Sequence, residues 1–359
     1  MSHSTKDVTT KALLVLPHLR VQNANAISSP LTHGFPSITA FTGLMWALQR
    51  KLTAAGLPLK LRQVGVICHH HEEQLTDGYV KTFRLTRNPV DRDGATAAIV
   101  EEGHIHLELT VMFQLTVPAS QLLASGAGST ADQRAQMSEW AARVAEIVAC
   151  MRIAGGTLLP TGSMPGRRTR AWMEPISEDE EAQALVFARW RYQWLPGYAL
   201  VGRDDLLADR HRTMRGALPD ATLLDAWLDA ARFNFKPVPG DPSKSTPGNS
   251  KAEKQRWADP SKQKGDGWTV PIPVGYAALT KPLPAGAVAN TRDASTPCVF
   301  VESVYSFGQW ISPHRLNHVQ EILWRPETDA AIGLYRCLSG YVHAGSATTL
   351  AGDDIPDFD

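Results

Sequence analysis

The sequence has few cysteines, no net charge and no long apolar run, and each of these absences excludes a class of protein. Its four cysteines, Cys68, Cys150, Cys298 and Cys337, lie far apart and form no C-x-x-C pair, which argues against a structural zinc site or a disulfide framework. The first residues lack the apolar segment of a signal peptide, and no apolar run approaches a membrane span. We therefore expect a cytoplasmic protein with no membrane segment.

Lysine plus arginine and aspartate plus glutamate number 36 each, so the formal net charge is zero. This balance excludes a bulk polycation, and a nucleic-acid-binding role would rest on a local basic surface or on a basic partner. Enzyme motifs are missing as well: there is no P-loop, no G-x-S-x-G, no H-E-x-x-H, and no G-x-G-x-x-G opening a helix after a strand. These absences favour a protein without a cofactor or a bound metal.

With 359 residues, 43% of them apolar, the chain can bury a sizeable core. Apolar periodicity predicts helices at 37–54 and 131–151 and strands at 12–17, 61–68, 79–85, 104–117 and 154–160. The strand at 104–117 alternates most clearly and is predicted to be antiparallel and half exposed. This element order predicts an α+β fold, a ferredoxin-like or RRM-like antiparallel sheet with both helices on one face. The other face would stay free to hold a single strand of nucleic acid.

Changes in composition divide the chain into predicted segments. We expect an RRM-like core at 1–160, an inserted basic arm with helices at 161–236, a flexible linker at 237–266, strands that complete the core at 267–345 and a disordered acidic tail at 346–359. The linker is rich in Pro, Gly, Ser and Lys and contains Trp257. Stacking of this tryptophan on a base stays open beside a plain linker role.

The segment 21–36, predicted as the loop between the first strand and the first helix, is rich in neutral polar side chains. The candidate binding residues in it are Asn23, Asn25, Ser28, Ser29 and His33. Amide, hydroxyl and imidazole groups can contact bases, sugars and phosphates at close range. The same residue types also turn a chain from strand into helix, so a purely structural role stays open.

Three consecutive histidines, His69, His70 and His71, follow the strand at 61–68. Neighbouring residues of a strand point to opposite faces, so these side chains cannot share one metal if the strand continues through them. We interpret the segment as a polar loop rather than a metal site.

A basic stretch follows the predicted core. Arg167, Arg168 and Arg170 stand in a Gly- and Pro-containing context that predicts a flexible basic hairpin or loop. The arginines could form an arm on phosphates, or the loop could simply be solvated. Two further helices are predicted beyond it, at 204–214 and 220–234.

A second stretch lies near the C-terminal end of the chain. Gly308, Trp310, His314 and Arg315 predict a loop in which the glycine lets a backbone approach, the tryptophan stacks and the arginine pairs with phosphate. Equally, Trp310 could anchor the core and Arg315 could pair with an acidic side chain of the same block.

Two blocks of the sequence resemble one CRISPR protein family. The first contains NAN, SSP and GFP in this order, followed by the helix TAFTGLMWALQRKL at 39–52. The second contains GWTVPIPVGYAAL at 267–279 and NTRDASTPCVFVESVYSFGQWISPHR at 290–315. Both are similar to the second Csy subunit of the type I-F CRISPR-Cas surveillance complex (Cascade), a Cas five-type member of the RAMP superfamily. The resemblance covers both ends of the chain and is weak in the middle.

The resemblance implies a non-catalytic subunit for antiviral defence, with no cofactor. Its implied partners are the 5′ handle of the crRNA, the large first Csy subunit and the backbone Csy subunit, with target DNA only an indirect partner. It implies that Asn23, Asn25, Ser28 and Ser29 contact handle bases or sugars. It further implies that Arg292, His314 and Arg315 contact phosphates, and that the arm reaches RNA, displaced DNA or a neighbouring subunit.

Two other functions stay open. Related CRISPR proteins include metal-independent endoribonucleases that use a histidine as acid or base, and the candidates here are His18, His33 and His314. The other alternative is a protein-interaction scaffold that makes no contact with RNA.

Overall fold

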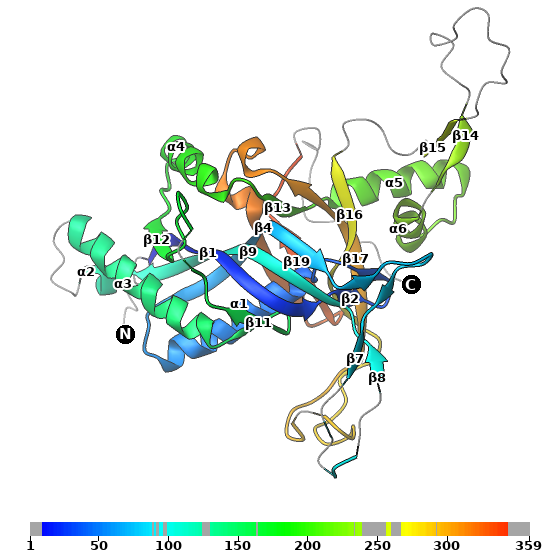
Figure 1. The fold of residues 1–359 in the computed structure, drawn as a ribbon, viewed down its shortest axis with the longest axis horizontal. Helices are drawn as coiled ribbons and strands as arrows, with labels where there is room; N and C mark the ends of the chain where they lie inside the picture. The colour runs from blue at the N-terminus through cyan, green and yellow to red at the C-terminus, as the bar shows by residue number, and fades with distance from the viewer. Residues whose placement is uncertain are drawn as a thin grey trace, which may run out of the picture.

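In the computed structural model, the chain is described over residues 9–87, 90, 93–95, 99–123, 130–162, 164–232, 234–238, 256–259, 267–291 and 293–343. These residues form a mixed α+β fold with a large antiparallel sheet (Figure 1). Arg292, the predicted acidic tail and most of the predicted linker lie outside the described residues. The start of that linker segment, in β14 (Lys236–Val238), pairs with a later part of it, β15 (Arg256–Ala258), as a short ladder.

The main sheet is described here in its spatial order. Its strands are β10 (Arg152–Ile153), β11 (Gly156–Leu159), β1 (Thr9–Asn25), β9 (His104–Pro118), β4 (Lys60–Glu73), β13 (Tyr198–Gly202), β17 (Val301–Ile311), β16 (Trp268–Ala278), β19 (Leu334–Ser339) and β18 (Leu323–Asp329). A further strand, β12 (Trp172–Pro175), pairs with β1. Because β18 also pairs with β4, the strands from β4 to β18 close into a ring.

The remaining elements are helices and short ladders. The helices are α1 (Ile38–Ala54), α2 (Ala119–Leu123), α3 (Thr130–Ala149), α4 (Glu180–Arg191), α5 (Asp204–Ala217) and α6 (Leu223–Ala231), with 3-10 turns η1 (Tyr192–Trp194), η3 (Pro313–Arg315) and η4 (Val319–Ile322). The short strands are β2 (Ile27–Ser29), β3 (Thr32–His33), β5 (Leu75–Thr76), β6 (Thr82–Phe83), β7 (Leu85–Arg87) and β8 (Ile99–Glu101). No helix of the described ranges is both long and apolar enough to span a bilayer.

Helices α1 and α3 cover one face of the sheet, as the periodicity predicts. Ser37 caps α1, since its hydroxyl accepts the Thr39 N–H at 3.2 Å. The predicted apolar stripe of this helix is buried against the inward residues of β1, β4 and β9, in a core that also contains Trp140 and Val144 of α3. The predictions of α1, α3, α5 and α6 are confirmed, with ends that differ by a few residues.

The opposite face is only partly free, which corrects the prediction of a face left open. A second core covers one end of it, built from Phe187, Trp190 and Trp194 around α4 and η1 and from Leu316 and Ile322 of the C-terminal turns. In Figure 1, α4 lies above the strands and α1 below them. Strand β9 is antiparallel as predicted, but it is not half exposed, because it is central in the sheet and this second core lies over part of its polar face.

The first strand is longer than predicted, so Val21 to Asn25 belong to β1 and not to a loop. Two bulges interrupt its pairing with β9, at positions where His18 and Asn23 adopt positive φ angles of 51° and 55°. A bulge inserts an extra residue and lets a strand continue past a sequence that breaks strict alternation. The predicted strand ended near the first bulge because the alternation of apolar and polar residues breaks there.

Two other predictions need correction. His69, His70 and His71 lie within β4, which runs on to Glu73 because β9 offers pairing partners as far as Ile105. The strand predicted at 79–85 is reduced to the short elements β6 and β7, and Tyr79 to Lys81 lie outside both.

Candidate nucleic-acid interface

A cavity of about 450 Å³ opens where the β2–β3 hairpin meets the ends of β4, β13 and β16. It is lined by Ser28, His33, Gly34, Phe35, Cys68, His69, His70, His71, Glu73, Ile105, Tyr198, Trp268, Val270, Pro271, Ile272 and Trp310. These residues come from segments far apart in the chain, and the sheet register brings them together. Trp268, at the start of β16, faces Trp310 across the β16–β17 ladder, and Tyr198, at the start of β13, pairs with Cys68 of β4.

Aromatic rings dominate one side of the cavity. Trp268 is 51% exposed and Tyr198 is 48% exposed, and their ring centroids lie 6.4 Å apart in an edge-to-face arrangement. The His71 ring lies 6.3 Å from Trp268. Trp310 is only 9% exposed and packs edge-on against Phe35 at 4.8 Å. Half-exposed rings over an aromatic floor are a surface on which unpaired bases can stack.

The hairpin side of the cavity is polar. The His33 Nδ1–H donates to Glu73 Oε1 at 2.9 Å, and the Ser28 and Thr32 hydroxyls lie 2.7 Å apart. Ser29 is buried, and its hydroxyl accepts the Leu31 N–H at 3.1 Å.

Hydrogen bonds inside the hairpin support a structural role for Asn25 and Ser29, which the sequence had left open. The Asn25 amide bonds both backbone groups of Ile27, accepting its N–H at 2.9 Å and donating to its carbonyl at 2.8 Å. Asn25 and Ser29 therefore shape the hairpin, while Ser28 and His33 line the cavity.

A row of polar side chains crosses the sheet beside the cavity. The rings of His18 and His69 stack with centroids 4.3 Å apart, and the His18 Nδ1–H donates to Glu108 at 2.7 Å. His69 donates from Nδ1 to the Pro196 carbonyl at 2.8 Å and accepts the Thr110 hydroxyl at Nε2, at 2.7 Å. Burial lowers the pKa of His69 from 6.5 to about 4, so its ring is neutral at physiological pH.

This neutral histidine predicts a loss of stability in acid. The folded-state pKa of about 4 lies below the unfolded value of 6.5, so the unfolded chain binds more protons between these pH values. The His69 contribution is complete above pH 6.5 and falls as the pH drops toward 4, by about 3 kcal/mol at most. Urea unfolding at several pH values checks this: the wild type should lose more stability across the window than His69→Gln. Parallel curves for the two proteins would contradict the prediction.

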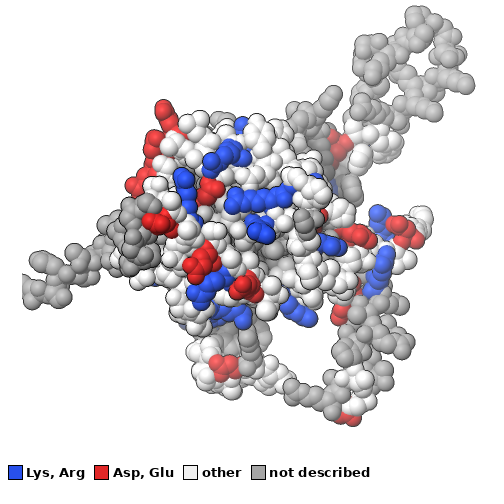
Figure 2. Space-filling model, turned by 60° about the vertical axis from the view of Figure 1, so that its left-hand side comes forward, with Lys and Arg blue, Asp and Glu red and all other residues white. Residues whose placement is uncertain are grey.

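The predicted arm, Arg167 to Arg170, folds back onto its own sheet. Arg167 lies 3.8 Å from Glu108, and Arg168 lies 3.9 Å from Glu174 with its guanidinium over the Trp172 ring at 4.9 Å. Arg170 is exposed and has no ion pair among the described residues. In Figure 2, several Lys and Arg side chains gather near the middle of one face, with Asp and Glu side chains beside them. The basic surface is therefore local and mixed with acidic groups.

The residues predicted as one glycine-, tryptophan- and arginine-containing loop are separated. Gly308 and Trp310 lie inside β17, which corrects the loop prediction, and a Cβ at Gly308 would come within 2.9 Å of Leu200 and Ile272. Packing between strands thus explains this glycine. His314 and Arg315 are exposed on η3, between the second-core residues Ile311 and Leu316.

This η3 turn is held by α4. Arg191 donates to the His314 carbonyl at 3.2 Å and to the Leu316 carbonyl at 3.0 Å. The His314 ring approaches the Ser312 hydroxyl at 2.8 Å, and Arg315 is exposed. Trp310 therefore belongs to the cavity and Arg315 does not.

Sequence reasoning missed the aromatic side chains that define the cavity, Trp268 and Tyr198, and their neighbour His71. Trp268 lies in one of the blocks that carry the family resemblance, but nothing local distinguishes it from a core residue. Asn23, a sequence candidate, lies at the second bulge, where its N–H donates to His106 at 3.1 Å. Within the described ranges, no three His, Cys, Asp or Glu side chains gather in a way that could hold a metal ion.

Comparison with known proteins gives concordant matches. A family model described as "CRISPR-associated protein (Cas_Csy2)" matches residues 14–337. CRISPR-associated protein Csy2 of Pseudomonas aeruginosa (strain UCBPP-PA14) is 42% identical over 331 residues, which cover 91% of this chain and 94% of that protein. The matched region includes the cavity and the middle of the chain, where the motif resemblance is weak.

Proposed function

The chain belongs to the Csy2 family of CRISPR-associated proteins, and on that premise we propose that it holds the 5′ handle of the crRNA in the type I-F surveillance complex. As a Csy2 subunit it is a component of an antiviral defence system. The proposed role is positional and non-catalytic. Fixing a short hooked RNA lets the guide region begin in register for pairing with target DNA.

The observation that carries the proposal is the open aromatic cavity. Trp268 and Tyr198 present half-exposed rings, and Ser28 and His33 add hydrogen-bonding groups to the lining of the same cavity. Stacking holds a base of any type, while hydroxyl and imidazole groups can read its edge. A handle nucleotide turned out of its strand is the ligand that this combination suits.

The proposed fold of the core is the RRM-like arrangement. Its support is the strand order β11, β1, β9, β4, with α1 following β1 and α3 following β9 on one face. Relative to this RRM-like core, the aromatic cavity lies at the end of β4. It is next to the part of the sheet face opposite α1 and α3 that α4 does not cover. The zero net charge implies that the large first Csy subunit supplies part of the basic surface, with the backbone subunit as the neighbour on the guide side.

Arg315 stays a proposed phosphate contact, separate from the cavity. We expect Arg315→Ala to weaken binding to all RNAs and to reduce the salt slope of log affinity by about 0.7 for each phosphate that the guanidinium no longer neutralises. Fluorescence anisotropy at several salt concentrations measures this. Arg134→Ala, an exposed arginine on α3, is the matched control. An unchanged salt slope in Arg315→Ala would remove this residue from the interface.

A ribonuclease is the second candidate, and the stacked pair of His18 and His69 favours it, because acid–base cleavage of RNA uses two such groups. Access weighs against it, since His18 is 1% exposed and is held by Glu108. The other candidates, His33 and His314, lie on β3 and η3 with separate partners.

The test combines this chain with the large subunit of its own locus and a labelled repeat-derived RNA. Anisotropy at two salt concentrations compares the true handle with a scrambled one, and a denaturing gel follows the RNA. Tight, handle-dependent binding with intact RNA is the expected result. Cut RNA would support the ribonuclease, and binding to neither RNA would support a protein-interaction scaffold.

A further inference from the structure

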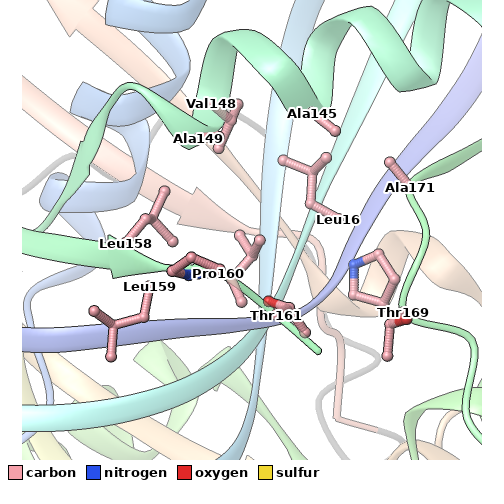
Figure 3. A pocket seen from close by; sticks show the side chains of 12 residues that line it. Leu16, Ala145, Val148, Ala149, Leu158, Leu159, Pro160, Thr161, Thr169 and Ala171 are labelled. Atoms are coloured by element: carbon pink, nitrogen blue, oxygen red, sulfur yellow. The ribbon is translucent and has the colours of Figure 1, made fainter. Parts of the chain in front are cut away.

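A second pocket lies on the outer edge of β1, away from the aromatic cavity. Its volume is about 290 Å³, and its walls come from α3, β1, the end of β11 and the segment before β12. Figure 3 shows Ala145 and Val148 of α3 on one side, with Leu158 and Pro160 on another. This is about twice the ~150 Å³ of an engineered apolar cavity that takes up benzene.

The pocket exists because the edge of β1 lacks a neighbour over a short stretch. Strand β12 pairs with residues 12–15 of β1 and β11 pairs with residues 20–22, so residues 16–19 have neither strand beside them. The bulge at His18 falls in this gap. The Thr161 hydroxyl donates to the His18 carbonyl at 3.1 Å, which satisfies one of the backbone groups there. The other walls are mainly aliphatic.

Exposed arginines lie next to this pocket. Arg20 pairs with the lining residue Leu159 across the β1–β11 ladder, and Arg152 pairs with Thr157, two residues before Leu159, so these two arginines share the face of Leu159. Arg170 stands between the lining residues Thr169 and Ala171, and Glu146, next to Ala145 on α3, is an exposed acidic neighbour. All three arginines are exposed, and none makes an ion pair within the described ranges. An apolar pocket with a cationic rim is complementary to an apolar side chain flanked by carboxylates.

We propose that this pocket docks a segment of a partner protein that inserts one aliphatic or aromatic side chain and places Asp or Glu on the arginine rim. Nucleic acid fits less well, although its phosphates would suit the rim. The twelve residues that line the pocket include no aromatic ring for a base to stack on, and Thr161 and Thr169 are its polar side chains. A base would leave most of its polar edge unpaired.

The test uses the purified, assembled Csy complex, so it rests on the family's complex membership but not on handle binding. A photo-crosslinking benzophenone amino acid replaces Ala149, an exposed residue that lines the pocket. The control places it at Ala142, exposed elsewhere on the same helix. We expect a crosslink from position 149 alone, to a peptide of another protein chain that contains Asp or Glu close to an apolar residue. A crosslink to RNA, to this chain, to a peptide without acidic residues, or to nothing would overturn the proposal.

A filling variant gives a second readout. Ala149→Trp should raise the dissociation constant for the crosslinked subunit at least about tenfold, while Ala142→Trp should leave it unchanged. Handle-RNA binding by Ala149→Trp should stay at the wild-type level, which separates failure of this proposal from failure of the proposed function. Equal subunit affinity in both tryptophan variants would also overturn it.

Discussion

Replacing Trp268 by alanine is expected to weaken binding of the handle RNA by about 5- to 150-fold, corresponding to roughly 1–3 kcal/mol for one stacked base. The side chain is 51% exposed at the start of β16, so its removal takes little from the core. The effect should therefore appear in RNA affinity and not in folding. Anisotropy with the handle RNA and the large subunit measures it, with circular dichroism as the check on folding.

Trp257→Ala is the matched control for this variant. Trp257 is 60% exposed on β15 and does not line the cavity, so its removal deletes a ring of the same size from a different surface. The same variant decides the stacking role left open for Trp257 in the linker segment. If Trp268→Ala bound the handle as tightly as the wild type, the cavity would not be the RNA site. If Trp257→Ala showed the same drop in affinity, the RNA interface would extend to β15.

Trp324→Ala should give the largest loss of stability, about 3–5 kcal/mol of unfolding free energy. Trp324 is 1% exposed on β18, its indole N–H donates to the Leu200 carbonyl at 2.8 Å, and its ring lies where a Cβ on Gly202 would clash. It also pairs with Val64 of β4, where β18 closes the ring of strands. Truncation leaves a large void and an unpaired carbonyl at that closure.

Urea denaturation tests this expectation through the transition midpoint at an unchanged m value. Trp324→Phe should lose less unfolding free energy than Trp324→Ala, because phenylalanine keeps most of the ring volume and removes only the indole hydrogen bond. Trp257→Ala again serves as the control, and its effect should stay within about 0.5 kcal/mol. A loss in Trp324→Ala as small as that of Trp257→Ala would mean that the ring of strands does not depend on this side chain. The expected loss is a large fraction of the roughly 5–15 kcal/mol that an ordinary domain has.

The apolar periodicity of the sequence was enough to predict those helices and strands whose apolar side chains all pack into one core. The stripe of α1, the stripe of α3 and the alternation in β9 were all readable, because each repeats at the period of its own element and packs against one core. The family was also readable from short blocks near the two ends of the chain, and the comparisons confirm it. In the β2–β3 hairpin, Ser28 and His33 were identified as polar candidates, and both line the cavity.

Only the tertiary structure decided where the chain departs from the regular spacing of apolar residues in helices and strands. The bulges at His18 and Asn23 carry β1 into the segment predicted as a loop, and a bulge breaks the alternation by which a strand is recognised. The site itself depends on strand register: Tyr198 and Trp268 meet because β13 and β16 flank β17. Trp310 lines that cavity, while Arg315, on η3, is exposed beside the second core and does not line it. Neighbouring residues of a strand point to opposite faces, and no spacing in the sequence records which face a distant strand will cover.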